Sequence, residues 1–495
     1  MGEVAACGVL MARQPGVFHP IGTGLGDDNV PLRETGVTPA FLDADSLAAT
    51  LAALANRHQV PGAQLAVHHG GVTISAEFGD LEYGTAIPIT RHTAFPVGSI
   101  CKVATATLAM ILVGDGDLEL DAPLAEHLPE LGELGNQLTL CHLLSHTSGY
   151  ASSPDTVESA ALSLGRYVQK HCRLQDLIVP PGTAFTYSNR NFVLVGHLIE
   201  TLTGMNWSEA MESIVLRPLG IEATMVSARD RAGLGRPIAT GHSVNMAVGR
   251  TRPVEQPEVP SEAPGVGLAM SAFDLVTLGL MHVGLGFPEL LPVAYAEQMR
   301  QAIPGVEPFG LADGWGAGLA VYQGETATWV GHDGNGNGTC CYLRIDPVNE
   351  VVVALNTSAN TGSFVWHELR NQLGLASPRS PQRCDGPSLP RIDPAELVGS
   401  YSNGSTEFLI TAGDEADLLL GIGGEHVARL AFYDDLEFFI QDPVSRQGQH
   451  VGRFLRDPIT KQVELVQIGG RLAPRQGLAV PEARSPIESL REVLA

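Results

Sequence analysis

The sequence predicts an α/β (α+β) protein whose main domain contains a largely antiparallel sheet, followed by a small β-barrel. Strand-like runs occur early, at residues 62–79, and late, at residues 326–358, and helical periodicity dominates between them. These two observations predict the main domain. The barrel is predicted by a third: beyond residue 394 the chain has only short apolar runs separated by Gly, Asp and Pro.

Apolar spacing and turn residues predict the individual elements. Residues 42–60 repeat apolar side chains at helical spacing after an Asp/Ser start, which predicts an amphipathic helix. Residues 62–79 contain two strand patterns around Gly70-Gly71, which predicts a hairpin. We expect the further elements in this order: helix 99–112, helix 141–146, helix 191–204, strand 326–334, strand 339–347 and strand 350–358.

Composition divides the chain into four parts. Residues 1–36 are rich in Gly and Pro without a clear period, and we interpret them as an N-terminal extension. Residues 37–376 form the predicted main domain, and the Pro-rich polar stretch 377–394 is the predicted linker. Residues 395–495 form the predicted β-barrel domain, with the strand-like runs EFLIT, DLLLGI, HVARLAF, LEFFI, HVGRFL and QVELVQI.

The charge balance restricts the partners of the protein. The net charge is −24, from 54 acidic and 30 basic residues, and such a surface repels phosphate backbones and anionic lipids. We therefore expect neither nucleic acid nor a membrane as a partner, and a small molecule or peptide as the substrate. The sequence leaves the oligomeric state open.

Targeting signals and cysteine usage favour a cytoplasmic protein. No apolar run approaches the ~20 residues of a membrane helix, and the first residues have no basic region and only a short apolar stretch, which makes a poor signal peptide. The seven cysteines are scattered without CxxC spacing, so we expect mostly reduced thiols. The adjacent Cys340 and Cys341 are expected to pack within a strand instead of forming a bridge.

Ser99 and Lys102 form an S-x-x-K pattern at the start of an apolar helical segment. Residues three positions apart on a helix project from the same face, so the two polar ends can touch. A serine hydroxyl becomes a nucleophile when a neighbouring base takes its proton, and a partly desolvated lysine can act as that base. The free N–H groups at a helix start favour developing negative charge. The alternative is an N-cap serine followed by a solvated lysine.

The tripeptide YSN occurs twice. Tyr187-Ser188-Asn189 lies between a Pro-Gly turn and a predicted helix, and loops held by helices often present functional groups. The second copy, Tyr401-Ser402-Asn403, lies at the start of the β domain and runs into a glycine turn. We therefore assign function to Tyr187 and Asn189, and expect Tyr401 to pack in the barrel.

An H-x-G pattern also occurs twice. His68-His69-Gly70 falls in the predicted hairpin turn, where we expect exposed histidines without a function. His332-Asp333-Gly334 ends a strand pattern and precedes a glycine-rich stretch, where small residues allow a substrate to approach the strand edge. A surface loop histidine is the alternative interpretation of His332.

Together, SICK, YSN and HDG resemble the serine β-lactamase and penicillin-binding protein superfamily, nearest to its class C-like branch of esterases, D-amino-acid peptidases and transacylases. Members carry S-x-x-K, Y-x-N and K-T-G or H-x-G elements in this order. LLSHTSGY at 143–150 and GDGDLELDAPLAEHLPEL at 114–131 are similar to further family segments, so the resemblance covers about residues 45–375. It implies an antiparallel sheet flanked by helices, with a helical subdomain. The last domain resembles the lipocalin-like barrels appended to D-aminopeptidases and to a penicillin-binding-protein type of peptide cyclase.

The resemblance also implies roles for the motif residues. Ser99 would be the acylated nucleophile and Lys102 its proton acceptor or orienting group. Tyr187 would pass a proton to the leaving group and activate the second acceptor. Asn189 would hold Lys102 and the substrate amide or acyl side chain.

The third motif and the backbone would complete this site. His332 would replace the lysine of K-T-G, and the backbone N–H groups of Ser99 and Asn335 would form an oxyanion hole, with Gly334 beside them. Such a hole stabilises the tetrahedral oxyanion. The missing lysine removes a fixed charge for a substrate carboxylate, which favours esterase-like or transacylase activity over β-lactamase activity.

We therefore expect a serine hydrolase or acyltransferase that forms an acyl-Ser99 intermediate and hydrolyses esters or amides. One alternative is a transacylase or peptide cyclase of natural-product biosynthesis that passes the acyl group to an amine or alcohol. Another is an inactive protein that binds ligands at the same site.

No cofactor or metal is expected. Cys141, His142 and His146 lie on one helical stretch and suggest zinc, but their match to the LLSHTSGY segment favours a structural role. The GTGLGD stretch at 22–27 lacks the flanking strand and helix of a dinucleotide site, and GHDGNGNG lacks the Gly-Lys-Ser/Thr ending of a phosphate loop.

Overall fold

The computed structural model describes residues 43–153, 157–226, 235–257, 259–284, 286–376, 378, 393–413, 418–422, 425–434, 436–441, 450–457 and 459–477. The extension predicted over residues 1–36, its GTGLGD stretch and most of the linker predicted over 377–394 lie outside these residues. The structure therefore does not test those three predictions.

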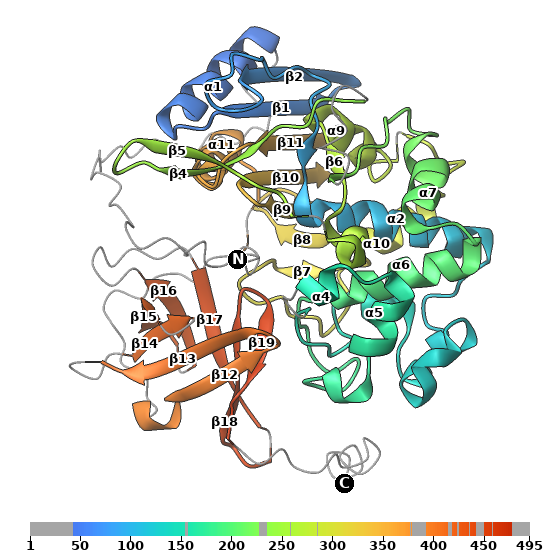
Figure 1. The fold of residues 1–495 in the computed structure, drawn as a ribbon, viewed down its shortest axis with the longest axis vertical. Helices are drawn as coiled ribbons and strands as arrows, with labels where there is room; N and C mark the ends of the chain where they lie inside the picture. The colour runs from blue at the N-terminus through green and yellow to red at the C-terminus, as the bar shows by residue number, and fades with distance from the viewer. Residues whose placement is uncertain are drawn as a thin grey trace.

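A seven-stranded antiparallel sheet forms the centre of the main domain (Figure 1), in the order β2-β1-β11-β10-β9-β8-β7. Its strands are β1 (Gly62–His69), β2 (Val72–Gly79), β7 (Gly314–Trp315), β8 (Ala320–Gln323), β9 (Thr328–Gly336), β10 (Thr339–Asp346) and β11 (Val351–Thr357). The predicted early hairpin and the three late strands are confirmed. The sequence gives no pattern for β7 and β8, because two and four residues are too few to display a period.

Helices cover both faces of this sheet. Successive strand residues point to opposite sides, and in β10 and β11 the residues on both sides are buried, so each face needs a covering layer. α1 (Ala44–Arg57) and α11 (Gly362–Leu373) pack on one face, over β10 residues such as Cys340. α9 (Ala272–Leu280) and α2 (Cys101–Asp115) pack on the other face, over residues such as Cys341 (Figure 1). The two adjacent cysteines are therefore buried strand residues, as predicted, and they are free thiols.

The stretch Gly98–Asp115, which includes α2, satisfies the length and hydropathy of a membrane-crossing helix. However, 83% of it is buried within the protein. Its side chains lie in the larger hydrophobic core, between the sheet and the helical region. Burial on all sides is the environment of a core helix and explains why this helix is apolar all round.

The helical region lies beside the sheet, on the side of α2 (Figure 1). Its elements are α3 (Leu140–Leu144), α4 (Val157–Ala160), α5 (Leu164–His171), α6 (Asn189–Thr203), α7 (Trp207–Ala210), α8 (Ala263–Val266) and α10 (Val293–Arg300), with short 3₁₀ and π turns between them. The predicted helix at 191–204 is α6, and it begins two residues earlier because Ser188 caps it by accepting a bond from Arg190 N–H.

Two short pairs of strands lie outside the main sheet. β3 (Phe95–Pro96) pairs with β6 (Ala269–Met270), and β4 (Gly241–Asn245) pairs with β5 (Arg250–Val254). The first pair lies directly ahead of Ser99 and connects its segment to the chain that leads into α9.

Eight antiparallel strands follow in sequence order and form the C-terminal barrel. They are β12 (Gly399–Asn403), β13 (Thr406–Ala412), β14 (Leu418–Ile422), β15 (Glu425–Phe432), β16 (Glu437–Gln441), β17 (His450–Arg456), β18 (Val463–Ile468) and β19 (Arg471–Pro474). A bridge between Tyr401 and Arg475 brings the first and last strands together, so the barrel is nearly closed. The predicted small barrel is confirmed.

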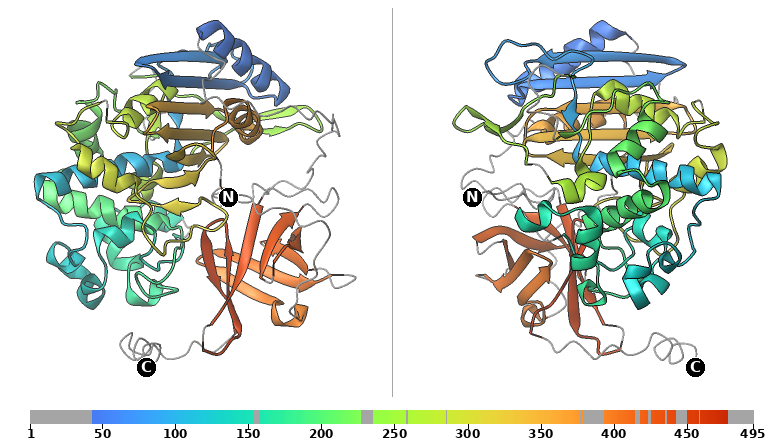
Figure 2. Two further views of the ribbon diagram at one scale, coloured as in Figure 1. Left: turned by 180° about the vertical axis from the view of Figure 1, so that it is seen from behind. Right: turned by 45° about the vertical axis from the view of Figure 1, so that its right-hand side comes forward.

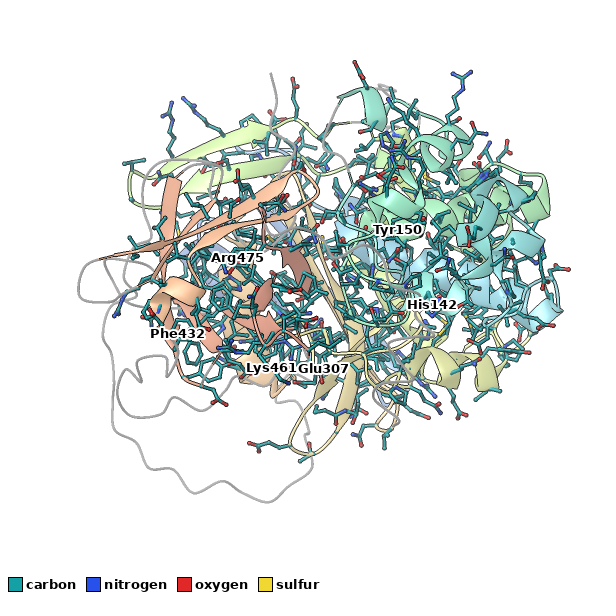
Figure 3. The ribbon with its side chains drawn as sticks, turned by 90° about the horizontal axis from the view of Figure 1, so that it is seen from below. His142, Tyr150, Glu307, Phe432, Lys461 and Arg475 are labelled. Atoms are coloured by element: carbon teal, nitrogen blue, oxygen red, sulfur yellow. The ribbon has the colours of Figure 1, made fainter. Side chains whose placement is uncertain are left out.

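Figure 2 shows the barrel beside the helical region of the main domain. Hydrogen bonds from Gln467 to Phe185 O and from Leu472 N–H to Thr186 Oγ1 join it to the segment that precedes α6. Asn403 of the second YSN copy lies in this interface: its Oδ1 accepts a 2.7 Å bond from Ser152 N–H, and its Nδ2 donates to Leu472 O. In Figure 3, Glu307 lies between the barrel and the helical region, and its carboxylate pairs with Arg453 at 2.7 Å.

One prediction about the first H-x-G copy is wrong. We expected exposed histidines in the hairpin turn, but His68 is buried within β1. Its Nδ1 lies 2.8 Å from Thr73 Oγ1 on the paired strand β2. The turn is Gly70-Gly71 alone, and β1 continues to His69, so His68 pairs with Thr73 inside the ladder.

Candidate active site

Ser99 lies in a 3₁₀ turn, Gly98–Ile100, that leads directly into α2. We expected Ser99 to open the α-helix, and α2 begins two residues later. Gly98 has a φ of +51°, and a Cβ there would lie 2.3 Å from Asn335 O on β9. A glycine is therefore required for the close approach of this turn to β9.

Lys102 contacts Ser99 directly. Its Nζ donates to Ser99 Oγ at 3.0 Å and to Gly265 O at 3.1 Å. The side chain is fully buried, and Nζ lies 5.3 Å from the centroid of the Tyr187 ring and 5.6 Å from that of Phe192. The three-residue spacing thus brings the hydroxyl and the amine together, as the sequence predicts.

Tyr187 joins this pair from the segment just before α6. Its hydroxyl lies 3.5 Å from His332 Nε2 on β9, and its ring lies 4.3 Å, centroid to centroid, from that of His146. Tyr401, the alternative tyrosine, is instead buried in the barrel core, where its hydroxyl donates to Leu397 O at 2.9 Å. The structure therefore brings the first YSN copy to Ser99 and confirms the packing role of the second tyrosine.

His332 is buried at the same place and is neutral at pH 7. Its Nδ1 lies 2.6 Å from Asp333 O; since a carbonyl only accepts, Nδ1 carries the proton and Nε2 faces Tyr187 as an acceptor. Burial, and after it the charge of Lys102, lowers the pKa of His332 to about 4. His332 is therefore not a surface loop residue, and it supplies no fixed positive charge.

A buried arginine supports the strand segment of His332. Arg344 Nη1 pairs with Asp333 Oδ1 at 2.5 Å, and its guanidinium lies 3.9 Å from the Tyr322 ring centroid and 5.2 Å from that of Trp366. Stacking and pairing together stabilise a charge that would be costly if buried alone. They also fix the direction of β9 beside Ser99.

Gly334 and Asn335 continue β9 past the Ser99 turn. A Cβ on Gly334 would lie 1.9 Å from Val97 O, so only glycine fits where β9 crosses the segment leading to Ser99. The backbone of Asn335 lies against Gly98 in the same way.

Asn189 contacts Glu262 instead of Lys102, its predicted partner. Its Nδ2 donates to Glu262 Oε2 at 2.9 Å, and its Oδ1 is buried without a hydrogen-bond partner, so it does not hold Lys102. A carboxylate is a strong acceptor and attracts the amide N–H group. Lys102 donates to Gly265 O in its place.

The comparisons with known proteins agree with this geometry. Residues 47–375 match the family model described as Beta-lactamase. The chain belongs to the beta-lactamase family. It is accordingly an enzyme of the serine hydrolase type.

Two curated relatives of this chain show that the similarity includes both a penicillin-binding protein and an esterase. It is 34% identical over 365 residues to penicillin-binding protein 4 of Amycolatopsis lactamdurans, covering 70% of this chain and 95% of that protein. It is 28% identical over 324 residues to esterase EstB of Burkholderia gladioli, covering 57% of this chain and 81% of that protein.

Among solved structures, the crystal structure of SurE is similar over both domains. Its TM-score is 0.77 at 35% identity, and the match covers 87% of this chain and 98% of that chain. Because this coverage exceeds the 47–375 family match, the similarity extends into the barrel.

The barrel supplies a positively charged side chain near Tyr187, and no sequence pattern indicated it. Tyr187 N–H donates to Gly470 O at 2.9 Å, and Leu472 N–H donates to Thr186 Oγ1 at 3.3 Å. These bonds place Arg471 so that its guanidinium lies 5.1 Å from the Tyr187 ring centroid. No local pattern marks Arg471 in the sequence, because its position depends on how the barrel docks.

His146, one of the residues weighed as a zinc ligand, packs beneath Tyr187. Its Nδ1 lies 3.2 Å from Ser188 N and 3.1 Å from Asn191 Nδ2, and burial holds its pKa well below the usual value. His142 instead belongs to the capping box of α3 with Thr139. Within the described ranges, no group of three or more His, Cys, Asp or Glu side chains could hold a metal ion.

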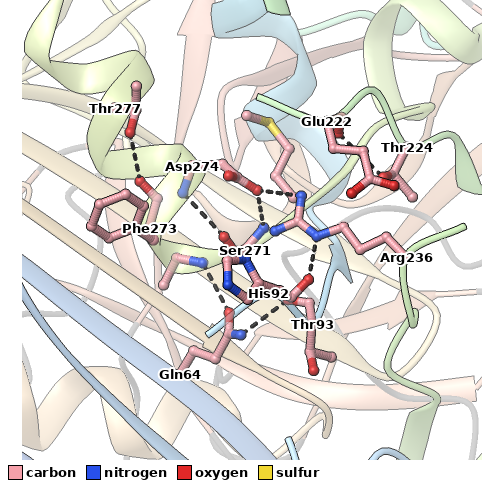
Figure 4. Close-up of polar contacts among 12 residues, drawn as sticks. Gln64, His92, Thr93, Glu222, Thr224, Arg236, Ser271, Phe273, Asp274 and Thr277 are labelled. Carbon is pink, nitrogen blue, oxygen red and sulfur yellow. Dashed lines mark hydrogen bonds and ion pairs between the residues drawn. The ribbon is translucent and has the colours of Figure 1, made fainter. Parts of the chain in front are cut away.

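A second polar network fixes the chain ahead of Ser99 (Figure 4). Gln64 Nε2 donates to Thr90 O at 2.5 Å and to Thr93 O at 3.0 Å, and its Oε1 accepts from Ala272 N at 2.9 Å. Arg236 pairs with Asp274 of α9 at 2.6 Å and donates to His92 O. Residues 90–93 are thereby tied to β1 and α9, which positions the turn that follows.

Proposed function

We propose that this chain is a serine acyl-transfer enzyme that forms an acyl-Ser99 intermediate and hydrolyses esters or amides. The observation that carries the proposal is the 3.0 Å contact between Lys102 Nζ and Ser99 Oγ, with the Tyr187 ring beside the same nitrogen. A nucleophile needs a base within hydrogen-bonding distance, and this pair meets that condition.

The first half-reaction uses three side chains. Starting as the uncharged amine, Lys102 takes the hydroxyl proton while Ser99 Oγ bonds to the carbonyl carbon of the substrate. Tyr187 gives its proton to the leaving group while the bond to that group breaks, and the proton on Lys102 then restores the phenol. The second half-reaction repeats these steps with water as the incoming group.

Two neighbours act on the two forms of Tyr187. The neutral His332 accepts from the phenol and orients it. The guanidinium of Arg471 lies over the ring, where its charge stabilises the phenolate that remains after the proton has left. Arg471 thus supplies near Tyr187 a positive charge that His332 does not.

The oxyanion of the tetrahedral intermediate is assigned to the backbone N–H groups of Ser99 and Asn335. Gly98 and Gly334 support this assignment because both lack a Cβ where the Ser99 turn and β9 meet. Preorganised donors at this position lower the barrier without reorganisation.

Transfer to an amine or alcohol is the second candidate function. It is favoured by the burial of the reacting groups, since Ser99, Lys102 and Tyr187 are at most 4% exposed. Exclusion of bulk water lowers the chance that water intercepts the acyl group. Products formed from a p-nitrophenyl ester with and without an added amine separate hydrolysis from transfer. A cytoplasmic location fits either function and stays a prediction.

A fluorophosphonate probe tests the proposal against an inactive binding protein. We expect stoichiometric labelling of the wild type and none of the Ser99→Ala variant. Absence of labelling in the folded wild type, or equal labelling of both proteins, would contradict the proposal.

A further inference from the structure

Glu262 lies close to the reacting groups. It ends the 3₁₀ turn Pro260–Glu262 and directly precedes α8 (Ala263–Val266). Gly265, three residues later, accepts the bond from Lys102 Nζ. The carboxylate of Glu262 contacts Asn189 Nδ2 at 2.9 Å, and Asn189 follows Tyr187 by two residues. Contacts at both ends of this short segment therefore tie Glu262 to the surroundings of Lys102 and Tyr187.

The contact between Glu262 and Asn189 fixes the orientation of the Asn189 side-chain amide. A carboxylate only accepts hydrogen bonds, so the Nδ2 end of this amide, which carries the N–H groups, faces Glu262 Oε2 at 2.9 Å. The amide oxygen is then the remaining atom, and it is buried without a donor. A buried acceptor without a donor costs free energy, which indicates a donor in the working complex.

One further oxygen beside Glu262 lacks a partner among the described residues. Ser261 is fully buried, and no donor or acceptor contacts its Oγ. The buried Tyr167 lies near the same carboxylate. Burial raises the pKa of Tyr167, and the charge of the nearby Glu262 raises it further.

No lysine or arginine in the described part of the chain forms an ion pair with Glu262. By contrast, Asp274 and Asp333 each pair with an arginine. The site therefore offers one negative charge and an amide oxygen without a matching protein cation. A primary ammonium carries one positive charge and three N–H donors, and it fits this set.

We propose that Glu262 and Asn189 Oδ1 bind the ammonium group of the substrate, so that the enzyme selects acyl donors with a free amino group near the reacting carbonyl, such as amino-acid or peptidyl esters and amides. This inference rests on the proposed function, because it places that donor at Ser99. Glu262 is a specificity residue and takes no part in bond breaking.

Binding to the Ser99→Ala variant tests the inference without requiring turnover. Isothermal titration calorimetry at pH 6.5 compares D- and L-leucine amide with 4-methylpentanamide, which has the same skeleton without the amino group. We expect at least one leucine amide to bind about 10-fold more tightly or better, since charge-assisted hydrogen bonds are the stronger ones. Its affinity should fall as the pH rises through roughly 8, where an α-amino group loses its proton.

Variants in the same background identify the residue. Ser99→Ala/Glu262→Gln should reduce the preference to about threefold or less and remove its pH dependence. The matched control Ser99→Ala/Glu297→Gln changes an exposed carboxylate on α10 and should keep the full preference.

The outcomes separate the two proposals. Equal binding of the amides and 4-methylpentanamide, no binding of any of them, or a preference that survives Glu262→Gln overturns this inference. Fluorophosphonate labelling of the wild type reports on the acyl-Ser99 proposal independently. Should the Glu262 variant not fold, the affinities of Ser99→Ala for the leucine amides and for 4-methylpentanamide still test whether the amino group is recognised.

Discussion

The backbone N–H of Tyr187 donates a 2.9 Å hydrogen bond to the carbonyl oxygen of Gly470, which joins the segment before α6 to the β18–β19 turn of the barrel. The barrel is therefore part of the surroundings of the candidate active site. This contact makes the position of the phenol depend on a residue nearly three hundred positions away.

Gly470→Ala tests this dependence. Gly470 has a φ of +72°, and a Cβ there would lie 3.0 Å from side-chain atoms of Leu311 and Phe185. We expect a loss of about 10-fold or more in kcat/KM, because a small displacement of a reacting group is costly. Gly477→Ala is the matched control, since its φ of +82° gives the same strain with nothing within 4 Å. Equal losses of kcat/KM in both variants would contradict the account.

The two YSN tyrosines provide a second matched pair. Tyr187→Phe should lower the rate by ~10²-fold or more, because proton transfer by a positioned side chain typically contributes this much. Tyr401→Phe should leave the rate unchanged and lower the free energy of unfolding by about 1 kcal/mol, through the lost bond to Leu397 O. Steady-state kinetics and urea unfolding check both values, and near-wild-type turnover of Tyr187→Phe would refute its role.

The third prediction concerns pH. The pKa of His332 is lowered to about 4 in the folded protein, so the unfolded chain binds more protons than the native one between pH 4 and the ordinary value of 6.5. Its stabilising contribution is complete above about 6.5 and is lost as the pH falls toward 4. Over that window the loss approaches roughly 3 kcal/mol.

His332→Gln should therefore flatten the dependence of unfolding free energy on pH in this window. The other buried histidines, His146 and His282, keep their share of the slope, because burial lowers their pKa values too. Unfolding titrations between pH 4 and 7 measure the difference. An identical slope in wild type and variant would show that His332 is not buried in its neutral form.

The Arg236–Asp274 ion pair should stabilise the chain segment that leads to Ser99. Its side chains are 4% and 13% exposed, and removing one partner of a buried pair typically costs about 3–5 kcal/mol. Arg236→Ala should therefore destabilise the fold strongly. Arg217→Ala breaks an exposed pair with Glu212 and should cost about 1 kcal/mol or less. Similar losses in both variants, by chemical denaturation, would be the contrary result.

The parts of the site that follow a local pattern could be predicted from the sequence. Ser99 and Lys102 touch because a helical turn brings positions three apart together, and this holds even though Ser99 lies in a 3₁₀ turn. Tyr187 was separable from Tyr401 because a loop before a helix and a strand before a turn have different sequence contexts.

The remaining parts depend on tertiary packing. Arg471 reaches Tyr187 only because the barrel docks against the main domain, and Glu262 meets Asn189 across seventy-three positions of chain. Neither residue belongs to a recognisable motif. The same holds for Arg344, which is buried beside Tyr322 of β8 and Trp366 of α11, two residues that are distant from each other in the sequence.

Intact-protein mass spectrometry during turnover tests the central claim most directly. The protein is mixed with a p-nitrophenyl ester, quenched in acid within seconds, and digested to locate any added acyl group. We predict one acyl group per chain, on Ser99, that disappears as substrate is consumed and is absent from Ser99→Ala. Turnover of the ester by Ser99→Ala at the wild-type rate, or an acyl group located on another residue during turnover, would contradict the account.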